Sequence, residues 1–495
     1  MSKIIIQNGN MCELDLPLKF AQKLYNEFAI RHPNAFYLRT RQRGMQNWDG
    51  KIHYITKTGQ FKIGLLPKVY DMCIEMGIKP KVVDMRQPLP KVSKVVTNIG
   101  KYKLRPEQEK AVKAVINNKI GNTPFHIGAL DYTVNAGKTL IMSSLYLSYK
   151  KQLKTLLITN DSDWLNQARE EFKQYLPGED ITFVQGKVLN WSNFTIGMVQ
   201  SISRNMRFYQ KELSQIDMVL IDEADQGGSK QYQNVITRLF NTRIRIGLSG
   251  TIYMSKLAKD KVKNMNLECF FGKVIAEFKL KDSIKKGYST KTVVKMVPGK
   301  PWYGNWESDC ISYKEIYDDS ITNCYTAWLM AYNRLLWNLN QGRYPALVVC
   351  KHIAHCENLY KFFKKKLGDA YNIAYVHVNT PSKLRQQIMK DFREGKIDIL
   401  VSTTIIARGK NFPKLKYLLN TASMDSQEKS IQFLGRLVRT DESKNKVYLD
   451  DLHYPGNYLD RHGKHRKQYY QRQELKVILL DKLWKKHPNH SLIKS

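Results

Sequence analysis

Short apolar runs alternate with longer stretches of helical patterning through most of the chain. Between about residues 100 and 280, the candidate buried strands are Thr155–Thr159, Phe194–Val199, Met218–Asp222 and Ile244–Ser249. After about residue 336, the candidates are Pro345–Cys350, Ala374–Val378, Ile397–Ser402 and Leu415–Asn420. Because buried strands separated by helices form βαβ units, the pattern predicts an α/β fold with two parallel-sheet domains in succession.

The same pattern divides the chain into five parts. The proline-containing stretch Gln87–Lys94 is typical of a linker, and it follows a unit with a hydrophobic stretch and a basic, aromatic region. We expect a small N-terminal α+β domain at residues 1–97, α/β domains at 98–280 and 336–450, a connector of unassigned fold at 281–335, and a basic tail at 451–495.

The charge balance narrows the class of partner. The chain has 80 Lys and Arg against 44 Asp and Glu, a net charge of +36. Such an excess favours polyanions, since neutralising phosphates releases counterions. Nucleic acid is the favoured partner, with a generally basic surface or an anionic membrane as alternatives.

Cysteine usage and hydropathy indicate the compartment. The seven cysteines are scattered and none lies in a CxxC pair, as is typical of a reducing compartment. No apolar run reaches the roughly 18–20 residues of a membrane span, and residues 1–7 turn polar too soon for a signal peptide. We expect a cytoplasmic protein with no membrane contact; the sequence is compatible with a monomer but does not fix the oligomeric state.

A candidate phosphate loop lies at Tyr132–Thr139, before an apolar helix. Such loops need inward-facing backbone N–H groups, a lysine for the β- and γ-phosphates and a hydroxyl for Mg²⁺. The candidate nucleotide contacts are Asn135, Ala136, Gly137, Lys138 and Thr139. The first glycine of the usual GxxxxGK[ST] pattern is replaced by Tyr132, so a chance Gly-Lys-Thr at a helix start is the alternative.

An apolar strand that ends in two acids supplies the second element. Asp222 is placed to bind Mg²⁺ together with Thr139, and Glu223 to polarise the attacking water. A strand ending in two acids is common by itself. The phosphate loop and the acidic strand in this order, about 80 residues apart, are more specific together, and they predict ATP and Mg²⁺ as ligands.

The third element is Ser430–Arg439, in the second predicted α/β domain. Arg436 and Arg439 are three residues apart, so they are expected on one helical face. From a second domain they could stabilise transition-state charge on the γ-phosphate as arginine fingers when a cleft closes. A solvated basic helix face is the alternative.

Taken in order, these segments resemble the motifs of helicase superfamily 2, whose motors contain two RecA-like domains. The resemblance covers about residues 100–450. It implies an adenine contact for Gln108, motif II at Asp222–Asp225, motif III at Ser249–Thr251, motif IV at Val348–His352, motif V at Ser402–Gly409, and motif VI at Gln432–Arg439 with Gln432 in the catalytic set. It also implies nucleic-acid contacts for Gln167, Gln200, Ser402 and Thr403, and a nucleotide contact for Gly409.

A narrower resemblance is to the UvsW-type DNA helicases of phages. Gln46–Ile52 resembles their NWDG segment, and Lys351, His352 and His355 resemble their motif IV. This resemblance implies an ATP-dependent DNA helicase that remodels branched or forked DNA by fork regression and Holliday-junction migration, in replication and recombination. It also implies an N-terminal DNA-binding domain before the motor and, for a phage protein, the host cytoplasm as its location.

The N-terminal unit carries its own candidate DNA contacts. Trp48 could stack on bases while Arg41, Arg43 and Lys51 hold phosphates. Alternatively, Trp48 is a core residue and the cations form a solvated face. If the unit grips DNA, deleting residues 1–97 should weaken junction binding and spare much of the ATPase activity.

Departures from the motifs leave rival functions open. Motif V has Asn411 where many relatives have Asp, and motif VI has Phe433 where Arg is common. An RNA helicase is one rival because Asp222–Asp225 spell DEAD, although motif VI lacks the His-Arg opening of that group. The other rivals are the motor subunit of a restriction system, for which we find no nuclease constellation, and a non-enzymatic nucleic-acid clamp.

Two further clusters have chemistry-bearing residues. Cys350, His352, His355 and Cys356 have the composition of a zinc site, but the spacing is cramped for four ligands from one segment, so structural packing is favoured. In the tail, the basic and aromatic residues are His462, His465, Arg466, Tyr469 and Tyr470. They either contact a phosphate backbone or dock a helix on the second sheet.

Overall fold

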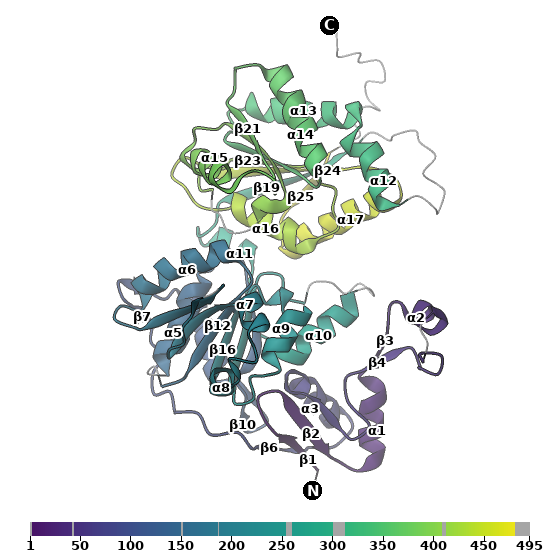
Figure 1. The fold of residues 1–495 in the computed structure, drawn as a ribbon, viewed down its shortest axis with the longest axis vertical. Coiled ribbons are helices and arrows are strands. Elements are labelled where there is room, and N and C mark those ends of the chain that lie inside the picture. Colours follow the sequence, from purple (N-terminus) through teal and green to yellow (C-terminus); the bar gives the residue numbers. More distant parts are fainter. Residues whose placement is uncertain are drawn as a thin grey trace. The chain divides into compact units, whose positions relative to one another are not determined.

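The chain folds into two compact units, Met1–Phe278 and Lys279–Ser495, which are described separately (Figure 1). The computed structural model describes residues 2–41, 44–149, 152–186, 188–253, 260–299, 312–407 and 412–480. Within these ranges, no helix has both the length and the apolarity required to cross a bilayer.

The first unit begins with a small four-stranded sheet in the order β5-β2-β1-β6. Its elements are β1 (Lys3–Ile6), β2 (Met11–Asp15), α1 (Leu18–Glu27), β5 (Gln60–Lys62), η1 (Ile63–Leu65), α3 (Leu66–Glu75) and β6 (Lys81–Asp84). β1 pairs antiparallel with β2, placing Ile4 opposite Leu14, and parallel with β6. Ile4 and Ile6 are both buried, so the period of two places one face of β1 in the core.

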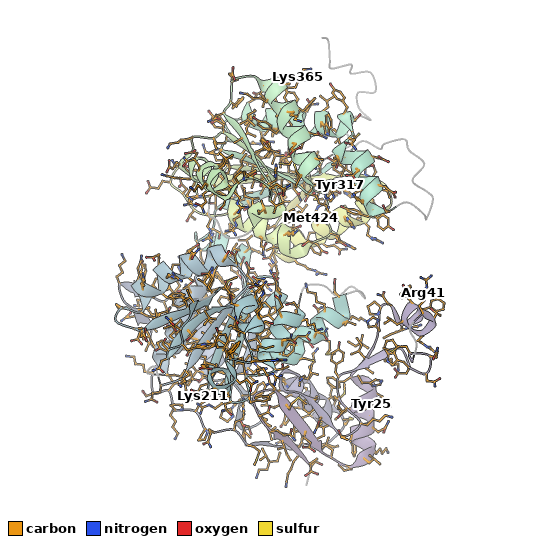
Figure 2. All side chains as sticks on the ribbon, in the orientation of Figure 1. Tyr25, Arg41, Lys211, Tyr317, Lys365 and Met424 are labelled. Carbon is orange, nitrogen blue, oxygen red and sulfur yellow. The ribbon has the colours of Figure 1, made fainter. Side chains whose placement is uncertain are left out.

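A projecting segment interrupts this small domain between α1 and β5. It contains β3 (Ala29–Arg31), α2 (Ala35–Arg41) and β4 (Lys51–His53), and we call residues 29–53 the lobe. β3 and β4 form a ribbon that carries α2 away from α1 and α3 (Figure 1). Arg41 lies at the outer part of the lobe, away from Tyr25 of α1 (Figure 2). Among the described residues of the lobe, only Ala35 and Gly50 are buried.

The first α/β domain is built on an eight-stranded sheet in the order β14-β13-β15-β12-β16-β17-β11-β18. The strands are β11 (Ile127–Tyr132), β12 (Thr155–Thr159), β13 (Ile181–Gln185), β14 (Val188–Leu189), β15 (Phe194–Met198), β16 (Met218–Asp222), β17 (Ile244–Ser249) and β18 (Val274–Phe278). All pair in parallel except β14, which pairs antiparallel with β13. The four strands predicted from apolar runs in this region are confirmed.

Helices and short hairpins complete this domain. The helices are α4 (Pro106–Ile116), α5 (Lys138–Ser148), α6 (Ser162–Tyr175), α7 (Val199–Arg204), α8 (Gln210–Ser214), η2 (Ala224–Gln226), α9 (Lys230–Ile236) and α10 (Lys261–Phe271). The hairpin strands are β7 (Asn98–Ile99), β8 (Tyr102–Lys103), β9 (Lys119–Ile120) and β10 (Thr123–Pro124).

The second unit is built on a seven-stranded sheet, all parallel, in the order β21-β22-β20-β23-β24-β19-β25. The strands are β19 (Lys291–Pro298), β20 (Ala346–Cys350), β21 (Ile373–Val376), β22 (Ile399–Thr403), β23 (Tyr417–Asn420), β24 (Lys446–His453) and β25 (Val477–Leu479). The helices are α11 (Leu280–Lys285), α12 (Tyr313–Tyr317), η4 (Asp318–Thr322), α13 (Tyr325–Leu339), α14 (Ile353–Leu367), α15 (Ser382–Glu394), η5 (Thr404–Ala407), α16 (Gln427–Leu437) and α17 (Asn457–Arg472). The prediction of two tandem RecA-like parallel-sheet domains is confirmed.

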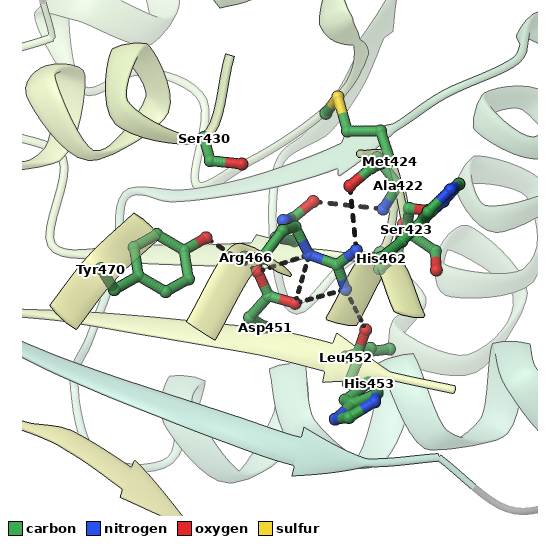
Figure 3. A network of polar contacts seen from close by, with 12 residues as sticks. Ala422, Ser423, Met424, Ser430, Asp451, Leu452, His453, His462, Arg466 and Tyr470 are labelled. Carbon is green, nitrogen blue, oxygen red and sulfur yellow. Dashed lines mark hydrogen bonds and ion pairs between the residues drawn. The ribbon is translucent and has the colours of Figure 1, made fainter. Parts of the chain in front are cut away.

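Two segments that the sequence left without a sheet position join the second sheet. β19, in the unassigned connector, lies between β24 and β25, and β25 comes from the basic tail. α17 docks through a buried ion pair in which Arg466 donates to Asp451 at 2.8–3.0 Å, and the Tyr470 hydroxyl donates to Asp451 at 2.7 Å (Figure 3). Of the two hypotheses for the tail, the docked helix is therefore the one that the contacts support for these residues.

The small N-terminal domain shares its core with the first α/β domain. One hydrophobic cluster contains Ile4 and Leu65 from the former and Ile127, Ile158 and Phe271 from the latter. Polar contacts reinforce the junction. These are Arg245 Nη2 donating to Gly9 O at 2.6 Å and Asn10 Oδ1 at 2.8 Å, Asn10 Nδ2 donating to Thr237 O at 3.1 Å, and Tyr54 Oη donating to Asn266 Oδ1 at 3.0 Å.

Candidate nucleotide site and nucleic-acid surfaces

The predicted phosphate loop connects the end of β11 to the start of α5. Its backbone is left-handed at Asn135 (φ 64°) and at Gly137 (φ 70°), the residue before Lys138. Tyr132, which replaces the usual first glycine, is buried as the last residue of β11, and its hydroxyl donates to Glu107 O at 2.7 Å. The structure thus explains the departure: the position ends a core strand, and the loop turns after it.

Gln108 lies against this loop rather than open to solvent. Its Oε1 accepts from Arg105 N at 2.8 Å, and its Nε2 donates to Ala136 O at 2.8 Å. A Cβ on Gly137 would lie 2.3 Å from the same Nε2. In this structure the amide therefore holds the loop in place, and the adenine contact stays a prediction.

Lys138 and Asp222 meet at the carboxyl edge of the first sheet. Lys138 Nζ lies 3.3 Å from Asp222 Oδ1, and the two side chains are 20% and 6% exposed. Burial favours the neutral amine, but the charges of Asp222 and Glu223 outweigh it and raise the pKa of Lys138. A lysine held cationic at this place suits contact with an anionic phosphate.

The residues for a magnesium ion fit that role. Asp222 Oδ1 is buried and faces Lys138 as an ion pair without a well-directed hydrogen bond, so its lone pairs remain available to a cation. Thr139 follows Lys138 in the first turn of α5, where it contributes a hydroxyl. Carboxylate and hydroxyl oxygens are ligands of the kind that Mg²⁺ takes beside a nucleotide.

Glu223 has the properties expected of a general base. Burial, together with the negative charges of Asp222 and Asp225, raises the pKa of Glu223 to about 7. Its backbone is left-handed (φ 51°), and its Oε2 accepts from Gln226 Nε2 at 3.4 Å. A carboxyl group with a pKa near neutrality can accept a proton at working pH.

Motifs II and III are joined by hydrogen bonds. Ser249 Oγ donates to Asp225 Oδ1 at 2.6 Å and accepts from Thr251 N at 3.0 Å. The acidic strand end and the Ser-Gly-Thr segment are therefore parts of one polar cluster.

The two predicted nucleic-acid contacts of the first α/β domain lie on helices that follow sheet strands. Gln167 is exposed on α6 and donates to Glu171 Oε1 at 2.5 Å. Gln200 is half-buried on α7 and donates to Asn160 O at 3.4 Å, while the Asn160 side chain donates to Gln226. Hydrogen bonds thus connect α7 with Gln226 and Glu223, a link that the sequence analysis did not find.

In the second unit, Ser402 and Thr403 end β22 and are both buried. Ser402 Oγ donates to Thr403 O at 2.9 Å, so this hydroxyl is used within the protein. The predicted contact of Gly409, with Arg408 and Asn411, lies outside the described residues. The nucleic-acid contacts of Ser402 and Thr403 stay predictions.

α16 ends within motif VI, so that some motif VI residues lie on the helix and others follow it. Gln432 and Arg436 lie half-buried on the helix, which ends at Leu437, so Arg439 comes after it. The prediction that both arginines share one helical face is wrong for this reason. Arg439 O instead accepts from Thr290 Oγ1 at 3.0 Å. Phe433 is buried, so a core position explains why this residue is not an arginine.

The predicted contacts of the lobe differ in exposure. Trp48 is half-buried; its indole donates to Lys51 O at 2.9 Å, and its ring makes a T-shaped contact with the ring of His32. Arg41 and Lys51 are exposed, and Arg41 lies over the ring of Tyr37 at 5.0 Å. Arg43 lies outside the described residues. These contacts give Trp48 a role in the shape of the lobe, and base stacking by Trp48 stays a prediction.

The candidate zinc cluster packs as part of the second sheet. Cys350 ends β20 and Cys356 lies on α14, both fully buried. Burial lowers the pKa of His355 to about 3, and its Nδ1 is hydrogen-bonded to the Tyr317 hydroxyl at 2.9 Å. These contacts are those of a packed strand end and helix start.

Comparison with known proteins identifies the class. The family model of the helicase conserved C-terminal domain matches residues 329–441, and that of the type III restriction enzyme res subunit matches residues 101–254. With the two RecA-like sheets, these matches place the chain in helicase superfamily 2.

Curated relatives are remote. Helicase 22 of the Sulfolobus islandicus filamentous virus is 22% identical over 385 residues, which cover 71% of this chain and 64% of the relative. The ATP-dependent helicase IRC3 of Saccharomyces cerevisiae is 23% identical over 377 residues, covering 70% and 51%. The chain thus spans less than two thirds of either relative.

One solved structure shares the fold, and a second is similar at a lower TM-score. The type ISP restriction-modification enzyme LlaBIII bound to DNA has a TM-score of 0.56 and 15% identity, covering 81% of this chain and 33% of that chain. T4 UvsW has a TM-score of 0.44 and 18% identity, covering 97% and 98%. Likeness at 15% identity shows the fold alone.

Proposed function

We propose that this chain is an ATP-driven DNA motor that hydrolyses ATP at the β11–α5 loop and remodels branched DNA. The observation that carries the first half is the cluster of Lys138, Asp222 and Glu223 at one sheet edge. An ammonium for phosphates, a carboxylate for Mg²⁺ and a carboxyl group with a pKa near 7 are the groups that hydrolysis of a γ-phosphate requires.

Each residue has a distinct part in this proposal. Lys138 holds the β- and γ-phosphates, while the N-terminus of α5 and the N–H groups of residues 135–139 cradle their oxygens. Asp222 and Thr139 hold Mg²⁺, which when bound neutralises charge on the phosphates. Glu223 orients the attacking water and takes its proton.

The second unit supplies Arg436 and Arg439 in this proposal. Guanidinium groups that approach only in a closed state stabilise the charge that develops on the γ-phosphate. Binding and hydrolysis then alternate closed and open states, which converts the chemical cycle into steps along a strand.

The test of the ATPase is Lys138→Ala. We expect the variant to lose at least about 100-fold in ATP hydrolysis, since a preorganised charge at the transferring phosphate is removed. Lys211→Ala, on the surface of α8, is the matched control and should hydrolyse ATP at the normal rate. Normal turnover by Lys138→Ala would refute the site.

Branched DNA as the substrate is supported by sequence features outside the ATP site. These are the net charge of +36 and the NWDG segment of the lobe, which lies outside the generic motor. The measurement is ATPase stimulation by a Holliday junction, a linear duplex and single-stranded RNA of matched length. Stimulation should be greatest with the junction.

An RNA helicase is the second candidate because Asp222–Asp225 match the DEAD tetrad. The same three-way comparison decides between them. Stimulation by RNA that exceeds stimulation by the junction would replace the DNA proposal and leave the ATPase proposal intact.

A further inference from the structure

A cavity of about 510 Å³ opens on the lobe between β3, α2 and the turn before β4. Its volume lies within the range of about 300–1,000 Å³ found for small-molecule sites. Three cations, Arg31, Arg39 and Lys51, line it together with Phe36. A cavity with this lining is suited to an anion that also carries an apolar face.

Two of the positively charged residues that line the cavity are neighbours in spite of their electrostatic repulsion. Arg31 and Lys51 are directly opposite each other in the β3–β4 ribbon, and like charges so placed destabilise a strand pair. Among the described residues, the guanidinium groups of Arg31 and Arg39 form no ion pair. Asp49 also lines the cavity, but His53 Nε2, 2.6 Å from its Oδ2, and the backbone of Lys51 already engage it. Asp49 keeps its own negative charge while it accepts these hydrogen bonds, so three cations and one carboxylate leave the cavity with a net positive charge.

Phe36 supplies a flat apolar surface beside this charge. Its side chain is 80% exposed, and Arg39 lies one helical turn further along α2, so the two share a helix face. An exposed aromatic ring among cations is the combination that binds single-stranded nucleic acid, through base stacking and phosphate contact. Stacking of this kind tolerates any base, as a motor that moves along DNA requires.

The NWDG segment builds the wall of this cavity. The Trp48 indole and the Asp49 carboxylate hold the backbone of Lys51 at 2.9 Å each. Gly50 has φ 77°, and a Cβ there would lie 3.1 Å from Ala35 Cβ on α2. The motif thus fixes the turn against α2 while the binding groups come from its neighbours.

We propose that this cavity binds one unpaired nucleotide of a DNA strand, with the base on Phe36 and the phosphate among Arg31, Arg39 and Lys51. The inference rests on the proposed function only in that the chain binds DNA. It goes further by assigning the part of the chain that recognises a branch, and the feature recognised, since a branch point offers unpaired nucleotides and a continuous duplex does not.

The experiment uses the full chain, a fork with 2-aminopurine at its first unpaired position, and a continuous duplex of the same length. Phe36→Ala should weaken fork affinity by about tenfold and restore 2-aminopurine fluorescence, since one stacked base is lost. Its duplex affinity should be unchanged. Tyr37→Ala is the matched control, because Tyr37 is the next residue of α2, is 55% exposed and does not line the cavity.

The outcomes separate this inference from the proposed function. If Phe36→Ala keeps its fork affinity and fluorescence quenching, or if Tyr37→Ala loses as much, the cavity is not the site. If the variants give either of these results while the unsubstituted chain hydrolyses ATP and binds the fork, the cavity proposal is overturned and the proposed function stands. If the unsubstituted chain binds neither DNA, the DNA motor itself is refuted.

Discussion

Two parts of the first hundred residues are under different physical constraints. The small sheet β5-β2-β1-β6, with α3, lies in the same hydrophobic cluster as the first α/β domain. The lobe inserted into it buries only Ala35 and Gly50 among its described residues. The sheet is therefore part of the motor's own core, whereas the lobe contributes almost nothing to that core.

The difference indicates where recognition can reside. A segment that the core does not need can present charged and aromatic side chains without destabilising the motor. The sheet that carries the lobe is itself held to the first α/β domain by contacts such as those of Arg245 with Gly9 and Asn10. Within the first hundred residues, the small sheet is therefore a structural foundation, and the lobe inserted into it is a candidate contact surface.

The largest expected effect comes from removing each part in turn. Deleting residues 1–97 uncovers the shared core, so we expect little soluble, folded protein, since each buried aliphatic side chain contributes about 1.5–3 kcal/mol. This argues against the expectation from sequence that such a deletion spares the ATPase. Replacing only residues 29–53 with a short Gly-Ser linker should preserve folding and basal ATPase, because Tyr54 N already donates to Phe28 O at 2.9 Å.

Expression yield, thermal melting and basal ATP hydrolysis of the two deletions are the measurements. A soluble, active chain lacking residues 1–97 would show that the shared core is dispensable. If the chain that lacks only the lobe is unfolded, the lobe is required for the stability of the first unit.

Hydrogen exchange should show the next largest contrast. Amides of β1 and β2 are expected to exchange through opening of the whole unit, whereas a two-stranded ribbon such as β3–β4 opens locally. We expect protection at Ile4 to exceed that at Ile30 by at least about 100-fold. Mass spectrometry of peptides from the two segments measures it, and equal protection would contradict the division.

Strong periodicity explains why the motor was predictable from sequence. The β16 residues 218–221 are all apolar because both sheet faces are covered, and Asp222 follows them at the end of the strand. β19 was not predicted: its run, Lys291–Pro298, has charged residues at Lys291 and Lys295 and no regular alternation, and its sheet position depends on pairing with a strand about 150 residues away.

The site was predictable where chemistry is local and not where it depends on packing. Lys138 and Asp222 follow from a loop and a strand end, and the structure brings them together. Two features could not be predicted, because they depend on neighbouring residues that no motif specifies. Gln108 donates a hydrogen bond to Ala136 O, and α16 ends before Arg439. The cavity of the lobe depends likewise on how α2 meets the turn at Gly50.

Adding one methyl group to the small N-terminal sheet domain should lower the stability of the first unit, whereas adding one to the lobe should not, with an effect smaller than that of the deletions. A Cβ at Gly9 would lie 2.6–2.9 Å from the carbonyl oxygens of Leu239, Thr242 and Phe240. We expect Gly9→Ala to lower the free energy of unfolding by about 1–3 kcal/mol, measured by chemical denaturation. Gly44→Ala in the lobe meets no atom within 4 Å; its positive φ strains only the lobe, so global unfolding should not change. Equal losses for the two variants would contradict the comparison.

The smallest expected effect concerns a cation on the lobe outside the cavity. Arg41 lies at the outer part of the lobe (Figure 2). It is exposed over Tyr37 and is not among the residues that line the cavity, so we expect it to contact a phosphate of duplex DNA without recognising a branch. Arg41→Gln should make the slope of log affinity against log salt less negative by about 0.9, the value for one phosphate contact in duplex DNA. Lys211→Gln on the motor surface is the matched control and should leave the slope unchanged. If Arg41→Gln changes neither the salt slope nor the affinity, the DNA-contact surface is confined to the cavity side of α2. If Arg41→Gln changes the slope and also abolishes discrimination between fork and duplex, the surface that recognises the fork extends around the helix.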